Sequence, residues 1–189
     1  MSVISRSFYN RKTDVVARDI LGKILVRRLG DKLLEGVIVE TEAYFGGDDP
    51  ASRAYDGLKT YNRVMFEEPG HLFIYNVHQY WMLNVIAHER GVGGILIRAI
   101  EPTMGIEDMK QNRPVKNIKD LTSGPGKLTL ALDVDKCLNG VDVTKKSSPV
   151  YLLDNQLDPE VETSHRIGVT RDLPKNYRYY VKNNRFVSR

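Results

Sequence analysis

The sequence predicts an α+β fold, in which a mostly antiparallel β-sheet is surrounded by helices and carries a protruding β-hairpin. Its 189 residues, 41% of them hydrophobic, suit one compact core. Runs of β-branched and aromatic residues outnumber the helical patterns. No repeat, low-complexity tract or linker divides the chain, so we expect a single domain over residues 1–189.

The first elements predicted are a helix and a hairpin. Thr13 is expected to cap a helix that ends at Gly22, because a hydroxyl residue suits a helix start and glycine suits the residue after its end. Strands are predicted over residues 23–29 and 33–44. The turn at residues 30–31 joins them.

A polar stretch over residues 45–62, rich in Gly, Asp, Ser and Lys, is typical of an ordered functional loop. Strands over residues 71–75 and 80–87 then form a second predicted hairpin. Residues 76–79 are expected to connect them.

The second half of the chain contains both strand and helix patterns. A strand over residues 94–100 is expected to stop at Pro102, since proline cannot donate to a sheet ladder. Helices are predicted over residues 105–112 and 127–132. Short strands and turns fill residues 150–189.

Composition narrows the function classes. A net charge of +4 suits a nucleic-acid partner without establishing one. The lone Cys137 fits a reducing compartment, and no apolar run is long enough to span a membrane. The four histidines and the lone cysteine have no metal-ligand spacing, so no zinc or iron–sulfur site is expected.

The strand over residues 37–44 carries the strongest chemical pattern. Because side chains alternate along a strand, Glu40, Glu42 and Tyr44 share one face. Paired carboxylates disfavour each other's ionisation and can supply a general base. A solvated outer face explains the same pattern, and the pattern alone does not say which glutamate acts.

Aromatic and basic residues interleave after this strand. Aromatic rings stack on extruded bases and cations neutralise phosphates, although Phe73 and Trp81 fit a hydrophobic core equally well. The set comprises Tyr44, Tyr55, Tyr61, Phe73, Tyr75, Tyr80 and Trp81 with Arg53, Lys59, Arg63 and His78.

Arg98 lies in an otherwise apolar strand. A guanidinium there is costly unless it is paired. The candidate partners are Glu101 or a glutamate of the strand over residues 37–44, as a structural ion pair or as part of an active site.

Together these residues resemble the alkyladenine (3-methyladenine) DNA glycosylase family, of the animal and bacterial type. The resemblance covers nearly the whole chain, from about Phe8 onward. It is carried by ARDILG (17–22), LVRR (25–28), VETEAY (39–44), DPAS (49–52), MF (65–66), LIRAIEP (96–102), LTSGPGKL (121–128), RIGV (166–169), YVK (180–182) and VSR (187–189).

The resemblance implies a role for each matched residue. Glu42 is the expected general base that activates water, and Arg98 helps to hold that water. Tyr44 and Tyr75 are expected to sandwich a base flipped out of the duplex. Asn84 lies at the pocket wall, where it excludes guanine by a clash with the exocyclic amine.

The implied activity is hydrolysis of the bond between a damaged purine and its sugar in double-stranded DNA. The family needs no metal or cofactor, and its fold is related to the C-terminal domain of formyltransferases. No lysine is placed to form a Schiff base, so strand cleavage is not expected. We expect an intracellular monomer that acts at DNA, in the cytoplasm or nucleoid of a prokaryote or otherwise in a nucleus.

Arg53 departs from the family pattern, because it stands where a histidine usually donates to the purine. Arginine is a permanently charged donor. It is expected to disfavour cationic bases and to favour the O6 acceptor of hypoxanthine. Alternatively, it swings out to a phosphate.

The hairpin turn also departs from the pattern, being one residue shorter than usual. The residue that fills the gap left by the flipped base falls near His78, and Tyr80 or Gln79 can share that role. The competing interpretation is a non-catalytic nucleic-acid-binding module of the same fold. An enzyme of nucleoside metabolism ranks last, since no Gly-rich phosphate loop is present.

Overall fold

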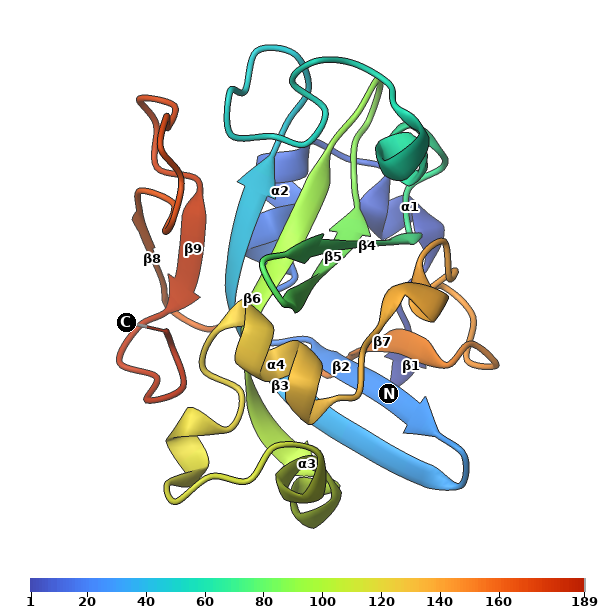
Figure 1. Ribbon diagram of the computed structural model, residues 1–189, viewed down its shortest axis with the longest axis vertical. Helices are drawn as coiled ribbons and strands as arrows, with labels where there is room; N and C mark the ends of the chain where they lie inside the picture. The colour runs from blue at the N-terminus through green and yellow to red at the C-terminus, as the bar shows by residue number, and fades with distance from the viewer. Residues whose placement is uncertain (189) are drawn as a thin grey trace.

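The computed structural model describes residues 1–188, and Arg189 of the C-terminal VSR motif lies outside them. A curled antiparallel sheet forms the centre, with α2 behind it and α4 in front (Figure 1). The predicted α+β fold is therefore confirmed. None of the helices described over residues 1–188 is long and apolar enough to cross a membrane.

The sheet runs in the order β1-β7-β2-β3-β6-β5-β4, and β9 joins it through β3 while also pairing with β8. Its strands are β1 (Ser2–Val3), β2 (Ile24–Leu29), β3 (Lys32–Tyr44), β4 (Leu72–Val77), β5 (Tyr80–Ile86), β6 (Gly94–Met104), β7 (Val150–Asp154), β8 (Val161–Ser164) and β9 (Arg178–Val181). The helices are α1 (Arg6–Tyr9), α2 (Thr13–Asp19), α3 (Ile106–Asn112) and α4 (Pro125–Ala131), with 3₁₀ helices η1 (Thr60–Phe66), η2 (Ile118–Asp120) and η3 (Lys136–Leu138).

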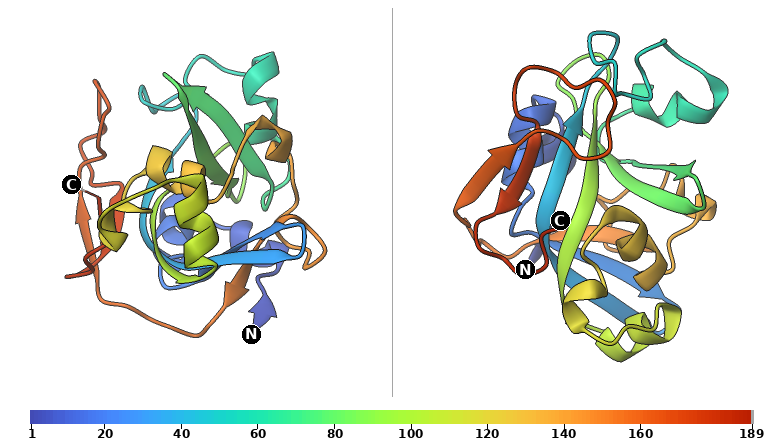
Figure 2. Two further views of the ribbon diagram at one scale, coloured as in Figure 1. Left: turned by 60° about the horizontal axis from the view of Figure 1, so that its bottom comes forward. Right: turned by 60° about the vertical axis from the view of Figure 1, so that its left-hand side comes forward.

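Strand β3 is the centre of this arrangement. Its first half pairs with β2, its last part with β9, and its other edge with β6, always antiparallel. Figure 2 shows the β8–β9 pair and the β4–β5 hairpin on different sides of these central strands. A residue on β3 can therefore meet side chains from several distant segments.

The two faces of β3 have opposite chemistry. On one face the Thr41 hydroxyl donates to the carbonyl of Ala17 in α2 at 2.6 Å. Val16 of that helix and Ile20, the residue after its end, are fully buried in the core. Burying this apolar side leaves the alternate residues of β3 facing the other way, where the candidate site lies.

The β4–β5 hairpin has a tighter turn than predicted. Val77 pairs with Tyr80, so only His78 and Gln79 form the connection. The predicted four-residue connection was wrong, because Asn76 and Val77 continue the ladder. His78 adopts a left-handed φ of 55°, as the first residue of a two-residue hairpin turn often does.

Three helix or strand boundaries also differ from the predicted ones. Thr13 is the first helical residue of α2 rather than its cap, and its hydroxyl donates instead to the carbonyl of Ala87. Strand β6 passes Pro102, where a register shift in β3 next to the facing Gly36 accommodates the proline. Helix α4 begins at Pro125, whose fixed φ suits the first helical position.

Candidate active site

Glu42 is the central side chain of the site and is fully buried. Its Oε1 accepts from the N–H of Ile167 at 2.7 Å. Its Oε2 accepts from the Tyr44 hydroxyl at 2.8 Å and from Arg98 Nη1 at 3.2 Å. Burial raises the pKa of Glu42, and the Arg98 charge with the other two donors opposes that rise. These donors leave capacity for one more, because a carboxylate has about four acceptor positions.

Glu40, on the same face of β3, accepts four hydrogen bonds. Its Oε1 accepts from Arg98 Nε at 2.9 Å, from Arg178 Nε at 2.7 Å and from the Ser188 hydroxyl at 2.8 Å. Its Oε2 accepts from the Ser188 N–H at 2.6 Å. Glu40 therefore holds Arg98, Arg178 and Ser188 together, whereas Glu42 is the carboxylate that bonds Tyr44.

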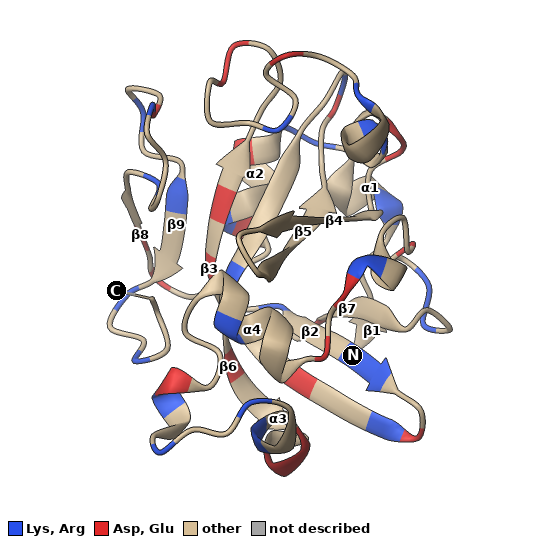
Figure 3. Cartoon of the chain, in the orientation of Figure 1, with Lys and Arg blue, Asp and Glu red and all other residues tan. Residues whose placement is uncertain are grey.

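Arg98 bridges the two carboxylates from β6. Acidic segments of β3 and a basic segment of β9 lie at the same level of the sheet (Figure 3). Although burial lowers it, Glu42 and Glu40 raise the pKa of Arg98 above its usual value. The glutamates of β3 are thus its partners. Glu101 instead accepts from Asn184 at 2.7 Å, and the solvated-face interpretation was wrong.

Two tyrosines adjoin Glu42. Burial and then the Glu42 charge raise the pKa of Tyr44 well above its usual value, so its hydroxyl stays a donor. Tyr75 of β4 stacks on Phe73 with ring centroids 5.1 Å apart. Burial raises the pKa of Tyr75, the Arg53 charge opposes this, and the Glu42 charge adds to the rise. Tyr44 and Tyr75 therefore lie in the field of the same carboxylate.

Arg53 lies over the Tyr75 ring, and Asn84 pairs with Phe73 across the β4–β5 hairpin. The exposed Arg53 places its guanidinium carbon 4.8 Å from the Tyr75 ring centroid. Asn84 of β5 is buried, and its Nδ2 donates to the carbonyls of Phe73 at 3.0 Å and Met82 at 3.2 Å. These two bonds fix the orientation of its amide.

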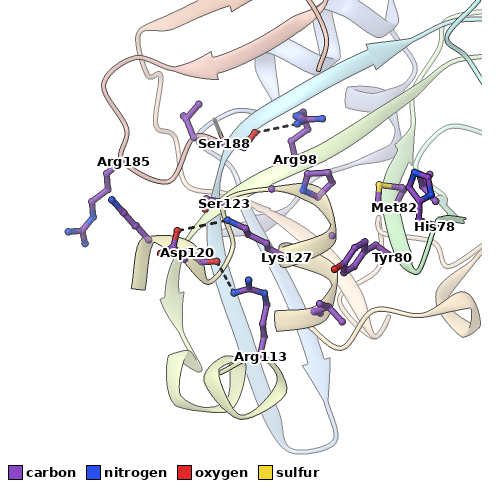
Figure 4. Close-up of a pocket in the computed structure, with 17 residues that line it drawn as sticks. His78, Tyr80, Met82, Arg98, Arg113, Asp120, Ser123, Lys127, Arg185 and Ser188 are labelled. Carbon is purple, nitrogen blue, oxygen red and sulfur yellow. Dashed lines mark hydrogen bonds and ion pairs between the residues drawn. The ribbon is translucent and has the colours of Figure 1, made fainter. Parts of the chain in front are cut away.

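The residues expected to intercalate lie farther out on the hairpin. His78 is exposed at the turn. The Tyr80 ring instead lies against α4, so closely that a Cβ added to Gly126 would come within 2.8 Å of the ring Cγ. His78 is therefore exposed at the turn, whereas the Tyr80 ring lies against α4 (Figure 4).

A segment that carried no predicted role completes the site. Arg166 and Asp49 form a fully buried bidentate pair at 2.7 and 2.8 Å, and Arg166 also bonds Asp172 at 2.8 Å. The Arg166 guanidinium lies 4.6 Å from the Tyr44 ring centroid, and Ile167 donates to Glu42. The RIGV motif marked this segment as part of the family pattern. The pairing of Arg166 with Asp49 could not be predicted, because residues 117 apart in sequence share no periodic pattern.

Arginine, rather than a cluster of metal ligands, surrounds the acidic groups of the site. Over residues 1–188, no three His, Cys, Asp or Glu side chains gather as metal ligands do. Glu40 and Glu42 both bond Arg98. In chemical terms, the site offers a buried carboxylate, two tyrosine rings and fixed hydrogen-bond donors.

A sequence model of the methylpurine-DNA glycosylase family matches residues 7–185. The chain belongs to this family. A protein from Mesorhizobium japonicum, described as a candidate 3-methyladenine DNA glycosylase, is 43% identical and covers 98% of this chain and 89% of its own length. Proteins with the same description from Clostridium perfringens (42% identical, covering 98% of each chain) and Aeropyrum pernix (38%, covering 99% of this chain and 93% of its own) are similar over the same range.

The chain is therefore a DNA glycosylase, a hydrolase of N-glycosyl bonds, as its sequence predicted. DNA is the substrate that membership of the methylpurine-DNA glycosylase family implies. In the site described above, the predicted Glu42 accepts direct hydrogen bonds from both Tyr44 and Arg98, which were predicted with it.

Proposed function

We propose that this glycosylase hydrolyses the N-glycosidic bond of a damaged purine, such as 3-methyladenine or hypoxanthine, in double-stranded DNA, with Glu42 as general base. One observation carries the proposal. Of two buried glutamates on one face of β3, Glu40 accepts four hydrogen bonds from two arginines and Ser188, whereas Glu42 accepts three, one of them from the ring hydroxyl of Tyr44, and has an acceptor position left on Oε1 for a water.

The chemistry follows from that carboxylate. Breaking the bond between C1′ and the purine nitrogen develops positive charge on the sugar, which a nearby anion stabilises. The bonding electrons leave with the base, the water oxygen bonds to C1′, and Glu42 accepts the water proton. Arg98 holds the Glu42 carboxylate in place at 3.2 Å.

The two tyrosines supply the base pocket in this proposal. Tyr44 follows Glu42 on the same face of β3 and bonds to it at 2.8 Å, so a base stacked on Tyr44 has its glycosidic bond near the carboxylate. Tyr75 provides the opposite wall. Stacking contributes about 1–3 kcal/mol per base, which offsets the few kcal/mol that base flipping costs.

The proposal is tested with a labelled duplex that carries one hypoxanthine or one 3-methyladenine. The wild-type protein is expected to release the base and leave an abasic site. Strand breaks then appear only after alkali, because no lysine forms a Schiff base with the sugar. Breaks without alkali would show lyase activity. Binding without base release on either lesion would favour a non-catalytic module.

Arg53 is expected to set the preference among lesions. Its guanidinium lies over the Tyr75 ring, where it repels a cationic base and can donate to the O6 of hypoxanthine. The wild-type protein should therefore excise hypoxanthine faster than 7-methylguanine. Arg53→Met should shift the ratio of the two single-turnover rates roughly tenfold toward 7-methylguanine, about 1.4 kcal/mol.

Lys59→Met is the matched control for Arg53, since Lys59 is an exposed cation of the same loop that pairs with Asp56 at 3.0 Å. It should leave the lesion ratio unchanged. Faster excision of 7-methylguanine than of hypoxanthine by the wild-type protein would contradict the role of Arg53 in lesion preference. A ratio that Arg53→Met leaves unchanged would place the arginine on a phosphate instead.

His78 is expected to fill the gap that the flipped base leaves. His78→Ala should slow excision from a duplex about tenfold, because a stacked ring contributes on the order of 1–3 kcal/mol. Excision from single strands, which have no stack to hold open, should change little. Gln79→Ala, at the other turn position, is the control. Equal losses on both substrates contradict the role in intercalation.

A further inference from the structure

The guanidinium of Arg98 is shared among three partners. Its Nε donates to Glu40 at 2.9 Å, its Nη1 to Glu42 at 3.2 Å and its Nη2 to the Ser188 hydroxyl at 3.3 Å. In Figure 4 a dashed line marks the bond between Arg98 and Ser188. Because one planar group serves two carboxylates, the way in which it is turned decides how well it holds Glu42.

Arg178 and Ser188 supply the other three hydrogen bonds that Glu40 accepts. Arg178 Nε donates at 2.7 Å, the Ser188 N–H at 2.6 Å and the Ser188 hydroxyl at 2.8 Å. The two residues also bond each other, since Arg178 Nη2 donates to the Ser188 carbonyl at 3.1 Å. Glu40 is thus held mainly by β9 and the C-terminal segment.

The fold brings these donors to β3 from distant parts of the chain. Arg178 lies directly opposite Glu42 in the β3–β9 ladder, and opposite residues of paired strands point to the same face. Ser188 follows Phe186, which is buried in a cluster with side chains of β3 and β6. This anchor keeps Ser188 against Glu40.

The charges of this group balance only when Arg178 is counted. The side chains of Glu40 and Glu42 are 0% exposed, and those of Arg98 and Arg178 are 7% and 10% exposed, so water screens them little. Two buried guanidinium groups therefore face two buried carboxylates. Without Arg178, one cation serves two anions, and a buried carboxylate that lacks a cation takes up a proton more readily.

We infer that Arg178 and Ser188 are positioning residues, which act on Glu42 through Glu40 and Arg98. An arginine favours two parallel bonds to one carboxylate. Because Arg178 and Ser188 already donate to both oxygens of Glu40, Arg98 gives Glu40 only its Nε and leaves Nη1 to Glu42. The inference rests on the proposed function, since it takes Glu42 as the base.

Loss of the Arg178 charge should make Glu42 harder to ionise. Burial already raises the pKa of Glu42, and the Arg98 charge opposes that rise. When Arg98 alone serves both glutamates, the pKa of Glu42 should rise further, so the acidic limb of the excision rate moves to higher pH. The other charged or titratable groups near Glu42 stay in place, namely Tyr44 on β3, Tyr75 on β4 and Arg166 beside the Tyr44 ring.

The test compares single-turnover excision of hypoxanthine from a duplex, at saturating protein and over a range of pH. A misplaced general base loses part of its contribution of about 10²–10⁴-fold, so Arg178→Met should lower the plateau rate about tenfold. Its acidic limb should move to higher pH. Ser188→Ala removes a hydroxyl and no charge. It should also lower the plateau rate, but move the limb less.

Arg28→Met is the matched control. Arg28 also lies over a tyrosine ring, 5.7 Å from the Tyr151 centroid, and donates to a carbonyl at 3.0 Å, but it bonds neither buried glutamate. This variant should keep the wild-type plateau rate and limb. Arg178→Lys keeps the charge without the planar donors, so it should restore the limb and only part of the plateau rate.

A second readout does not depend on excision. Among the NMR resonances of the glutamate carboxyl carbons, the one that Glu42→Gln removes belongs to Glu42, and in Arg178→Met it should titrate at higher pH than in the wild type. A titration equal to that in Arg28→Met overturns the inference, as does a wild-type plateau rate in Ser188→Ala. If Arg178→Met does not fold, the plateau rate of Ser188→Ala decides alone.

The two proposals fail in different ways. If the wild-type protein excises no lesion, or Glu42→Gln excises as fast as the wild type, the proposed function is wrong, while the titration of Glu42 still reports its coupling to Arg178. Normal excision by the wild type, with the Glu42 titration unmoved in Arg178→Met, removes the positioning role alone.

Discussion

Glu42→Gln is expected to lower the single-turnover rate of base excision by about 10²–10⁴-fold. The amide has the shape of the carboxylate but cannot take a proton from water, and it offers no negative charge to the developing sugar cation. The donors to Glu42 come from three different segments, the main chain of Ile167, the Tyr44 hydroxyl and Arg98. Because an amide NH₂ cannot accept, Glu42→Gln loses at least one of these bonds, so binding of the lesion duplex is measured separately from the rate.

Glu40→Gln is the matched control, since it makes the same change on the same face of β3. Glu40 holds Arg98 and Ser188 rather than a water, so its loss should cost stability and only about tenfold in rate. Alkali-revealed cleavage under single-turnover conditions measures both rates, and circular dichroism checks folding. Equal losses in the two variants would contradict the assignment of Glu42 as the base.

The pH profile separates the two glutamates further. Because burial raises the pKa of Glu42 above its ordinary 4.5, excision of a neutral base should fall as the pH drops through that raised value. Protonated Glu42 cannot accept the water proton. The Glu40→Gln variant should keep this acidic limb, and the residual activity of Glu42→Gln should lack it.

Arg166→Met is expected to destabilise the protein by about 3–5 kcal/mol, because it leaves the fully buried Asp49 without its cation. For a chain of this size that corresponds to a fall in Tm of about 6–20 °C. The substitution also removes the guanidinium from the Tyr44 ring and loosens the segment whose Ile167 donates to Glu42. The unfolding temperature and the excision rate should therefore both fall in this variant.

Lys175→Met provides the comparison, since Lys175 pairs with Asp14 at 3.0 Å while its side chain remains 63% exposed. Exposed pairs contribute about 0–1 kcal/mol, so this variant should unfold close to the wild-type temperature. Arg166→Lys keeps the charge but cannot form the bidentate pair, and should fall between the two. A Tm for Arg166→Met equal to that of Lys175→Met would show that the buried pair contributes no net stability.

The sequence predicted the parts of the site that depend on short-range alternation. Glu40, Glu42 and Tyr44 face the same way because they lie at every second position of one strand. An arginine within an apolar strand signalled a buried partner, and the two glutamates of β3 are that partner. The fold class followed from the same kind of local pattern.

Long-range pairs were not predictable in this way. Asp49 and Arg166 lie on loops, and no pattern in either segment indicates that the two residues pair. The contact between Ser188 and Glu40 joins residues 148 apart in sequence. The turn at His78 was predicted too long, because strand pairing across the hairpin extended beyond the residues that favour strands.

The contact of Ser188 with Glu40 can form only late in synthesis, because it joins residues 148 apart in sequence. Strand β3 leaves the ribosome early, whereas Ile167, Arg178 and Ser188 leave it much later. Until they arrive, the glutamates of β3 lack most of their donors and cannot be buried without cost. The nascent chain can therefore form its central hairpin well before the buried carboxylates of β3 gain their full set of donors.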